Sequence, residues 1–422
     1  MQSVRVTGRD LTAALKTVLT VIEKRTTIPI LGCVRIKEEG PRLTVEGTDL
    51  DMSIKTDCDV LSSSEDGFDA VVPAKMLAAA VKYAGAAPVD LVLEGKERKP
   101  VNLVLEGKER KRPKDRTRAD EEEEVETVID LTLSVIIADG DARFNIDLSS
   151  SPSDWPDVLD SFGGDAGQQV YETFSNGHFK KMLDTVALAI STEETRYYLN
   201  GVFWEPGEFV ATDGHRLVRH SYKHTSDAGN VKAIIPRKAV NVMRGLAKGD
   251  VITKFYYKPP VNPASKEEPP PPYLIFMFGN YRLTTKTIDG TYPDYKRVIP
   301  DASRAGKVLT LDGERLRDAV NRVLQIHIAS GSRGRAVSFK KDEDGKVILS
   351  SSALGEFTAT AKTFAEWPED FETKGLGFNG HYLLQFTQPG KMKIATEGDG
   401  CPALVSFEGE EDVTRVIMPM RV

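Results

Sequence analysis

Asp213 and His215, in the segment ATDGHRL, are the residues whose types and spacing could support acid–base chemistry. A carboxylate can orient an imidazole that acts as a general base, as it does in hydrolases and nucleases. No candidate nucleophile lies near the pair in the sequence. The tripeptide TDG is also typical of a turn in which Asp213 caps the backbone and Gly214 takes a positive φ. The turn is the favoured interpretation, and a metal-dependent hydrolase or nuclease is the alternative.

Other sequence patterns of catalysis and cofactor binding are absent. The chain has no GxxxxGK[ST], GxGxxG, GxSxG, HExxH or CxxC pattern, and the glycines at 163–167 lack the strand-to-helix context of a dinucleotide site. The acidic run DEEEEVE at 120–126 could hold a divalent ion, but consecutive carboxylates rarely build a defined site. We therefore expect no catalytic residue, no metal and no cofactor.

The composition is that of a globular protein, with 422 residues, 40% hydrophobic residues and a net charge of −7. This length predicts about three domains. Cys33, Cys58 and Cys401 lie far apart, which excludes a disulfide framework and favours a reducing compartment. The beginning of the chain does not resemble a signal peptide, and no apolar run approaches the roughly 18 residues of a membrane span. We expect a soluble cytoplasmic protein with no membrane partner.

An internal repeat indicates how the chain is organised. Apolar residues recur with the helical period in three segments, 11–22, 179–190 and 316–324, and each follows a short strand-like run. Each segment precedes a predicted strand pair, and then an extended run that leads into a second, shorter helix. The spacing of these features differs by only a few residues among the three copies. The chain therefore contains three copies of one unit.

The repeat predicts an α+β fold of three repeated domains, each with two helices packed on antiparallel sheets. The predicted domains span 1–168, 169–304 and 305–422. Two stretches interrupt the pattern: 91–126, in which LVLEGKERK occurs twice before a basic and an acidic run, and the proline-rich 258–272. Both are predicted to be solvated insertions between two hairpin strands. A nucleic-acid arm or a partner-binding tail is the alternative for the first.

Basic residues gather on the predicted helices although the whole chain is acidic. The segment 236–248 contains four basic residues and no acid, and 73–84 contains two and no acid. These faces could be ordinary solvated helix surfaces, or they could contact nucleic-acid phosphates without reading sequence. The candidate phosphate contacts on the helices are Lys75, Lys82, Lys180, Lys181, Arg237, Lys238 and Arg244.

The segment VIMPMRV at 416–422 is more apolar than an exposed segment needs to be. It could be a last core strand. Methionines at an accessible surface could also form an adaptable groove for peptides.

Several short segments of the sequence resemble those of the bacterial DNA polymerase III beta subunits, the sliding clamps. In the order of that family, they are RTTIPILG (25–32), TDLDM (48–52), TRYYLNG (195–201), ATDGHRL (211–217), IIPRK (234–238), DGTYPDYKRVIP (289–300) and VIMPMRV (416–422). The resemblance covers the chain except for the two insertions, and it agrees with the threefold repeat.

The resemblance implies a head-to-tail homodimer that closes as a ring around duplex DNA, with helices lining the hole. Such a ring holds DNA by enclosure, so its phosphate contacts are weak and independent of sequence. It performs no covalent chemistry, and it tethers a replicative DNA polymerase after loading by a clamp loader. Repair polymerases and other clamp-motif proteins are the further partners that the resemblance implies.

The resemblance also implies a hydrophobic pocket between the second and third domains, where a short peptide motif of each partner docks. Aliphatic and methionine walls would receive leucine or aromatic side chains, while His215, Arg216 and Asn379 would fix the peptide backbone. The matching positions are Leu199, Thr212, Gly214, His215, Arg216, Leu217, Pro293, Val298, Asn379, Tyr382, Val416, Ile417, Met418, Pro419, Met420 and Arg421.

For DNA, the resemblance adds Arg25 as an inner contact, and Arg196, Tyr197 and Tyr198 as a loop that touches the strand by charge and stacking. This chain departs from the family at some positions. Glu193 replaces a neutral polar residue that often contacts DNA, Gly334 lies where an aromatic residue is common, and Gly380 and His381 differ from the usual spacer. A clamp that serves only a repair or mobile-element polymerase is the alternative within the same class.

Overall fold

The computed structural model covers the whole chain. It describes residues 2–23, 25–98, 128–156, 170–224, 232–247, 252–258, 273–301, 307–344, 346–353, 357–366, 376–398 and 400–422. The chain forms two compact units, one of Met1–Gly164 with Asn280–Thr284, the other of Asp165–Gly279 with Thr285–Val422. The three-domain division into 1–168, 169–304 and 305–422 is finer than these units and stays a prediction.

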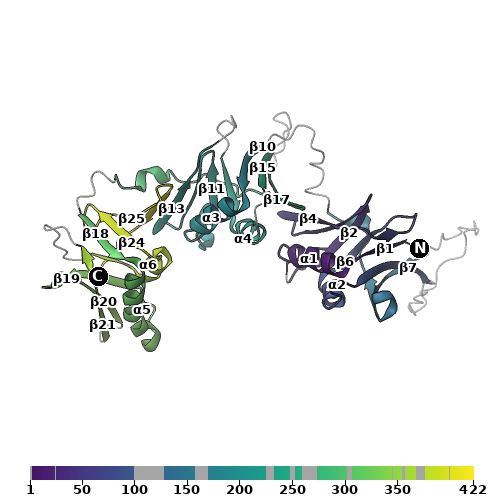
Figure 1. The fold of residues 1–422 in the computed structure, drawn as a ribbon, viewed down its shortest axis with the longest axis horizontal. Helices are drawn as coiled ribbons and strands as arrows, with labels where there is room; N and C mark the ends of the chain where they lie inside the picture. Colours follow the sequence, from purple (N-terminus) through teal and green to yellow (C-terminus); the bar gives the residue numbers. More distant parts are fainter. Residues whose placement is uncertain are drawn as a thin grey trace, which may run out of the picture. The chain divides into compact units, whose positions relative to one another are not determined.

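The first unit contains one copy of the predicted repeat (Figure 1). Its described residues form the α-helices α1 (Gly8–Val18) and α2 (Ala74–Val81), which contact each other. One sheet has the order β5-β1-β7-β8-β9, and a second series of paired strands runs β4-β3-β2-β6. The strands are β1 (Gln2–Thr7), β2 (Cys33–Glu39), β3 (Arg42–Thr48), β4 (Met52–Asp59), β5 (Ser62–Ser63), β6 (Asp69–Pro73), β7 (Pro88–Arg98), β8 (Val128–Ile137) and β9 (Ala142–Leu148).

The second unit contains the other two copies. The helices of the first pair are α3 (Asn176–Ala187) and α4 (Arg237–Leu246), and those of the second pair are α5 (Gly313–Ser330) and α6 (Gly380–Phe386). The helices of each pair contact each other. Of the second unit's strands, three pair in the order β10-β15-β16: β10 (Val170–Ser175), β15 (Ile252–Lys258) and β16 (Tyr273–Phe278). Strand β17 (Tyr281–Lys286) spans the boundary between the units.

One nine-stranded sheet joins these two copies, in the order β14-β11-β12-β13-β26-β25-β24-β18-β22. Its strands are β11 (Gly201–Glu205), β12 (Glu208–Thr212), β13 (Arg216–Ser221), β14 (Ala233–Pro236), β18 (Lys307–Asp312), β22 (Ala365–Glu366), β24 (Lys391–Thr396), β25 (Ala403–Phe407) and β26 (Val413–Ile417). A four-stranded sheet has the order β21-β20-β19-β23. It consists of β19 (Ala336–Lys341), β20 (Val347–Ala353), β21 (Phe357–Thr363) and β23 (Gly377–Asn379).

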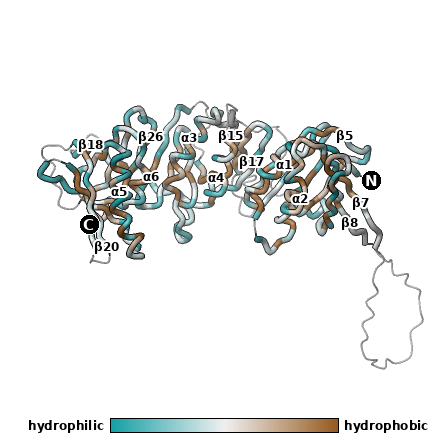
Figure 2. Tube along the Cα trace, turned by 60° about the horizontal axis from the view of Figure 1, so that its bottom comes forward, coloured by the Kyte–Doolittle hydropathy of each residue, from teal (hydrophilic) through white to brown (hydrophobic). Residues whose placement is uncertain are grey.

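Hydrophobic and hydrophilic residues both occur along the helices (Figure 2), as expected of helices whose apolar residues recur with the helical period. On α1, Leu11, Leu15 and Val18 are fully buried, while a side-chain cap from Thr7 to the backbone of Asp10 begins the helix. The prediction extended this helix to residue 22, but it ends at Val18, and the buried residues that follow lie in turns. The predicted α+β class and the two helices of each copy are confirmed.

The predicted insertion at 91–126 begins too early. Residues Leu91–Arg98, within the first LVLEGKERK, belong to β7, which pairs with β1 and β8. Leu91, at the start of this segment, is fully buried. Both interruptions do lie between paired strands, β7 with β8 and β15 with β16. Residues 99–127, including the acidic run, and 259–272 lie outside the described residues.

Candidate functional site

The segment ATDGHRL forms the predicted turn between β12 and β13. The Asp213 Oδ1 atom accepts hydrogen bonds from the backbone N–H groups of His215 and Arg216, both at 2.9 Å. Gly214 has a φ of 85°, which an L-residue with a side chain rarely adopts. The carboxylate therefore stabilises the turn and the Arg216 side chain, whose Nε lies 3.1 Å from Asp213 Oδ2. Both oxygens of the Asp213 carboxylate are thus bonded within the turn, which does not favour a catalytic pair with the His215 imidazole.

An apolar cavity of about 280 Å³ lies beside this turn, and we call it the partner cavity. Three segments supply most of its walls: the 3₁₀ helix at Glu194–Leu199, the strands β13 and β26 with their ends, and the 3₁₀ helix at Tyr295–Val298. Its lining residues are Arg196, Tyr198, Leu199, Thr212, Gly214, Arg216, Leu217, Pro293, Asp294, Tyr295, Val298, Val416 and Met418.

The pairing of β13 with β26 brings residues about 200 positions apart to one wall. Leu217 lies opposite Val416, and the backbone N–H of Met418 donates to the carbonyl of His215 at 2.8 Å. Leu217 and Val416 belong to one buried cluster with Leu199 and two tyrosines. The floor of the cavity is therefore part of the hydrophobic core, which fixes its shape before any ligand binds.

A buried cation closes one side of the cavity. Only 8% of Arg216 is exposed, and its guanidinium lies 4.2 Å from the centroid of the Tyr382 ring. It also donates a hydrogen bond to Gln385 on α6. Burial lowers the pKa of Arg216, while the charge of Asp213 opposes this shift. The contacts to Asp213, Tyr382 and Gln385 hold the guanidinium in one place at the edge of the cavity.

A second arginine of the cavity is bound to Glu193. The Arg196 Nε and Nη2 atoms lie 2.8 and 2.7 Å from Glu193 Oε2, and the hydrogen bond from this carboxylate raises the pKa of Arg196. A Cβ at Gly214 would lie 2.5 Å from Arg196 Nη1, so the glycine lets the guanidinium approach the turn. Glu193, which departs from the family pattern, thus holds an arginine predicted to touch DNA.

Nine of the predicted pocket residues line the partner cavity, and seven do not. Of the seven, Ile417 is fully buried, and the rings of His215 and Tyr382 stack with centroids 6.4 Å apart. Asn379 caps α6, because its Oδ1 accepts from the backbone of His381 at 3.0 Å. Beyond β26, Pro419 forms an isolated antiparallel β-bridge with Phe378. The backbone N–H of Met420 donates a hydrogen bond to the carbonyl of Gly377, and Arg421 is exposed.

Four residues line the cavity that were not predicted for it. Arg196 and Tyr198 were predicted to contact DNA, whereas Asp294 and Tyr295 were not singled out at all. Both of the latter lie in the DGTYPDYKRVIP segment, between Pro293 and Val298, which were predicted. Their position between two predicted lining residues was the available signal.

The helix residues predicted for DNA differ in how far their charges are balanced. Asp184 accepts hydrogen bonds from Lys180 on its own helix and from Arg244 on α4. Burial opposes its ionisation, but these two bonds lower the pKa of Asp184. Arg237 reaches the carbonyl of Ser191 at 3.4 Å. Lys181 and Lys238 are exposed, as are Arg25, Lys75 and Lys82 in the first unit.

The tyrosines of the predicted DNA loop contact each other, with the Tyr197 and Tyr198 ring centroids 5.8 Å apart. Tyr197 is 54% exposed, while Tyr198 lines the partner cavity. At Gly334, a Cβ would lie 2.3 Å from the His327 ring, so this buried histidine fills the space beside the glycine. Within the described residues, no group of three or more His, Cys, Asp or Glu could hold a metal ion, and no helix could span a membrane.

Known proteins resemble this chain over nearly its full length. Family models match at residues 3–112 (DNA polymerase III beta subunit, N-terminal domain) and 173–294 (the central domain of the same subunit). A beta sliding clamp of Caulobacter vibrioides is 30% identical, over 97% of both chains. The structure of a Caulobacter crescentus beta sliding clamp with bound PEG has a TM-score of 0.78 and 28% identity, and covers 100% of this chain and 99% of that one. A Bartonella birtlesii sliding clamp bound to griselimycin also has a TM-score of 0.78, with 26% identity and full coverage of both chains.

Proposed function

Because this chain belongs to the family of DNA polymerase III beta subunits, the beta sliding clamps, we propose that its partner cavity is the site where replication proteins dock. The protein is a DNA sliding clamp, a non-catalytic processivity subunit of the polymerase. Family membership excludes the hydrolase alternative for Asp213 and His215, in agreement with the turn that Asp213 stabilises.

One observation carries the docking proposal: the pairing of β13 with β26 builds a preformed apolar cavity with a cation fixed at its edge. Leu199, Leu217 and Val416 offer aliphatic walls to a leucine or aromatic side chain of a partner peptide. The guanidinium of Arg216 can hold the peptide backbone by hydrogen bonds. The proposed occupants are short motifs of the replicative polymerase catalytic subunit, the clamp loader, and repair polymerases.

The remaining proposals concern the assembly. Two chains would join head to tail as a ring around duplex DNA, in the cytoplasm. Exposed Lys181 and Lys238, with Arg25, Lys75 and Lys82 of the first unit, would make the phosphate contacts. Light scattering over a dilution series tests the dimer: a mass near twice the 46.5 kDa chain supports it, and a monomer at every concentration contradicts it.

The docking proposal is tested with a labelled synthetic pentapeptide that contains two leucines and a phenylalanine, with binding measured by fluorescence anisotropy. We expect a chain that ends at Ile417 to lose binding at least about tenfold, because Met418 lines the cavity and its N–H bonds to His215. Met418→Ala should weaken binding by about tenfold. Met420→Ala is the matched control, since Met420 does not line the cavity. Equal affinity of all four chains would overturn the proposal.

A further inference from the structure

The two helices of the first unit present a basic surface to solvent, which we call the helix face. Along α1, α2 and the three residues that follow α2, the chain has four basic residues and one acid, Asp10. The Asp10 carboxylate accepts a hydrogen bond from the Thr7 hydroxyl at 2.7 Å, so it is bound at the beginning of α1. The helix face therefore has an excess of positive charge. Its exposed residues are Arg9, Ala13, Lys16, Lys75, Met76, Ala79, Lys82 and Tyr83.

The packing of α1 on α2 joins their exposed sides into one surface (Figure 1). The Thr12 hydroxyl on α1 donates a hydrogen bond to the Val81 carbonyl at the end of α2, at 3.1 Å. A Cβ at Gly8 would lie 2.5 Å from the Cβ of Ala84, so the glycine lets the two segments approach closely. Leu77 and Val81 are fully buried, which turns the opposite side of α2 to solvent.

Apolar side chains lie exposed beside the lysines of α2. Met76 is 59% exposed and Tyr83 is 87% exposed, the largest value for a large hydrophobic residue in the described part of the chain. With Ala79 they recur at i, i+3 and i+7, which places them on one side of the helix. The Lys82 Nζ atom lies 5.0 Å from the centroid of the Tyr83 ring. One face of the ring therefore lies near a cation, and the other is open to a ligand.

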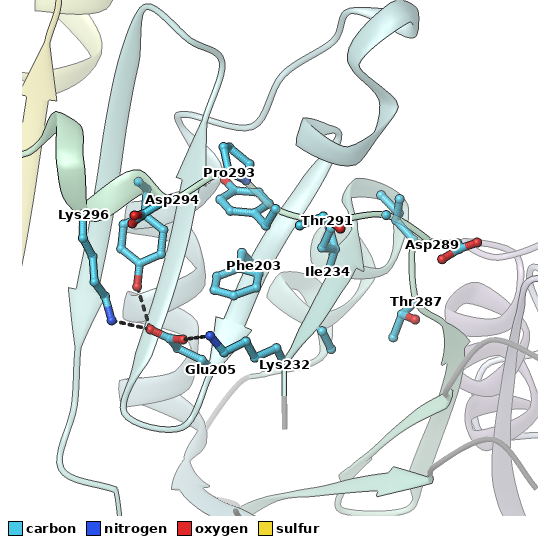
Figure 3. Close-up of a pocket in the computed structure, with 15 residues that line it drawn as sticks. Phe203, Glu205, Lys232, Ile234, Thr287, Asp289, Thr291, Pro293, Asp294 and Lys296 are labelled. Atoms are coloured by element: carbon cyan, nitrogen blue, oxygen red, sulfur yellow. Dashed lines mark hydrogen bonds and ion pairs between the residues drawn. The ribbon is translucent and has the colours of Figure 1, made fainter. Parts of the chain in front are cut away.

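The cations of the helix face differ from those of the second unit, many of which are bound to carboxylates. Figure 3 shows an example at a cavity of about 470 Å³. Lys296 Nζ there lies 2.8 Å from Glu205 Oε1 and 3.1 Å from Glu208 Oε1. On the helix face, by contrast, the basic residues other than Lys75 form no ion pair with any described residue. These cations are therefore available to an anionic ligand.

We propose that the helix face binds a single-stranded segment of DNA, with the Tyr83 ring stacked on an unpaired base and the basic residues on its phosphates. The proposal rests on the proposed function as a clamp on duplex DNA, and it adds a site for the unpaired strand. In a duplex the bases stack on one another, so an exposed aromatic ring can stack only on a base that is unpaired. The methionine beside it offers a polarizable apolar contact to the same base or the next.

The spacing of the lysines fits one strand. Seven residues of helix separate Lys75 from Lys82 by roughly 10 Å, and phosphates recur about every 3.4 Å along one stacked strand. The two ammonium groups would therefore contact phosphates about three nucleotides apart. This charge contact is independent of sequence, as is stacking on a base.

The test measures fluorescence anisotropy at low salt with three labelled probes: an oligothymidylate, a blunt duplex, and the same duplex with an oligothymidylate tail. Tyr83→Ala should weaken oligothymidylate binding by about tenfold, because base stacking is lost. It should also lower the affinity for the tailed duplex to that for the blunt duplex, whose binding should not change. Tyr83→Phe keeps the ring and should bind all three probes as the wild type does.

The matched control for Tyr83→Ala is Phe364→Ala in the second unit. Phe364 is 61% exposed, and Lys346 Nζ lies 5.4 Å from its ring centroid, so it is a similar pair of a ring and a cation. This variant should bind all three probes as the wild type does. Urea unfolding should give the same midpoint for wild type and Tyr83→Ala, since Tyr83 is exposed.

Charge variants separate the phosphate contacts from stacking. Lys82→Gln should weaken binding of every probe by about two- to fivefold and reduce the slope of the salt dependence by about one. Lys82→Arg should keep both, and Lys340→Gln, at an exposed position on β19, is the control.

The blunt duplex reports on the proposed function, and the loss that is specific to unpaired strands reports on the helix face. If Tyr83→Ala binds the oligothymidylate as the wild type does, the proposal is overturned and a protein partner is favoured for the helix face. An equal loss for the oligothymidylate and the blunt duplex would also overturn it, because Tyr83 would then contact the backbone and not a base. If the wild type binds none of the probes, both proposals fall.

Discussion

The partner cavity and the basic helices α3 and α4 were both predicted from the sequence, and they differ in what folding does to their residues. The cavity collects apolar residues from distant segments, and its wall is set by the pairing of β13 with β26. The helices keep their basic residues close in sequence, but Asp184 neutralises part of that charge by binding both Lys180 and Arg244. A count of basic residues on a helix therefore overstates the charge that a phosphate would meet.

The largest expected effect comes from the wall of the partner cavity. Leu217→Ala should weaken peptide binding by about thirtyfold, because it removes both an apolar contact and the shape of the floor. The same change should lower the free energy of unfolding by roughly 2–5 kcal/mol, since Leu217 is 2% exposed. Anisotropy titration and urea unfolding measure the two effects.

The control for Leu217→Ala is Leu43→Ala, a fully buried leucine on β3 of the first unit. It should destabilise the protein by a similar amount and leave peptide affinity unchanged. Equal losses of affinity in both variants would mean that the cavity depends on general stability rather than on its own wall.

The next effect concerns His220, on the strand that carries Arg216 and Leu217. Burial lowers the pKa of His220 to about 4; His178, Lys181 and Arg415 add to the shift and Asp412 opposes it. The unfolded chain takes up a proton near its ordinary value of 6.5, and the folded protein does so only near 4. The folded state should therefore lose stability as the pH drops from about 6.5 to about 4. The equilibrium constant for folding should fall by at most about tenfold for each pH unit in this range.

Urea unfolding at several pH values, with wild type and His220→Gln, measures this effect. The variant should lose stability at neutral pH and show a flatter pH dependence between about pH 6.5 and pH 4. Parallel pH profiles for the two proteins would show that other groups cause the acid loss.

The sequence predicted most of the fold because each repeat copy combines the helical period with capping and turn residues that act locally. Thr7 and Ser175 cap the first helices of their copies, and Gly214 fits the turn. The limits of the insertion were mispredicted, because a duplicated LVLEGKERK cannot reveal from local pattern alone that its first copy pairs with two strands.

The candidate site could be predicted only in part, for a different reason. Strand alternation decides which side of β26 faces the cavity, so Val416 and Met418 line it while Ile417 lies in the core. The resemblance to the clamp family implied all of 416–421 as pocket residues and did not separate those that line the cavity from those that do not. The ion pairs of Asp184 and Glu193 depend on rotamers and on neighbouring segments, which no count of residue types contains.

Asp184 can be replaced to measure how much of the basic charge of α3 and α4 its ion pairs neutralise. Asp184→Asn should increase the affinity for linear duplex DNA at low salt by about three- to tenfold and steepen its salt dependence, because Lys180 and Arg244 become available to phosphates. The three side chains are 35–39% exposed, so the cost in stability should be below about 1 kcal/mol. Glu397→Gln makes the same change in net charge at an exposed site on another segment. If both variants gain affinity equally, net charge rather than local pairing is responsible.

The smallest expected effect is at Glu193, where one carboxylate links the predicted DNA loop to the partner cavity. Glu193→Gln removes the ion pair that holds Arg196, at 2.7 Å, and should raise affinity for duplex DNA at low salt by about two- to threefold. The matched control is Glu194→Gln, which removes the same charge from the neighbouring residue. The gain should vanish in Glu193→Gln/Arg196→Ala, because the freed guanidinium is what contacts the phosphate. A gain that survives this double change would mean that Glu193 acts by repelling DNA itself. Arg196 would then not be a cation that its ion pair with Glu193 keeps from the DNA.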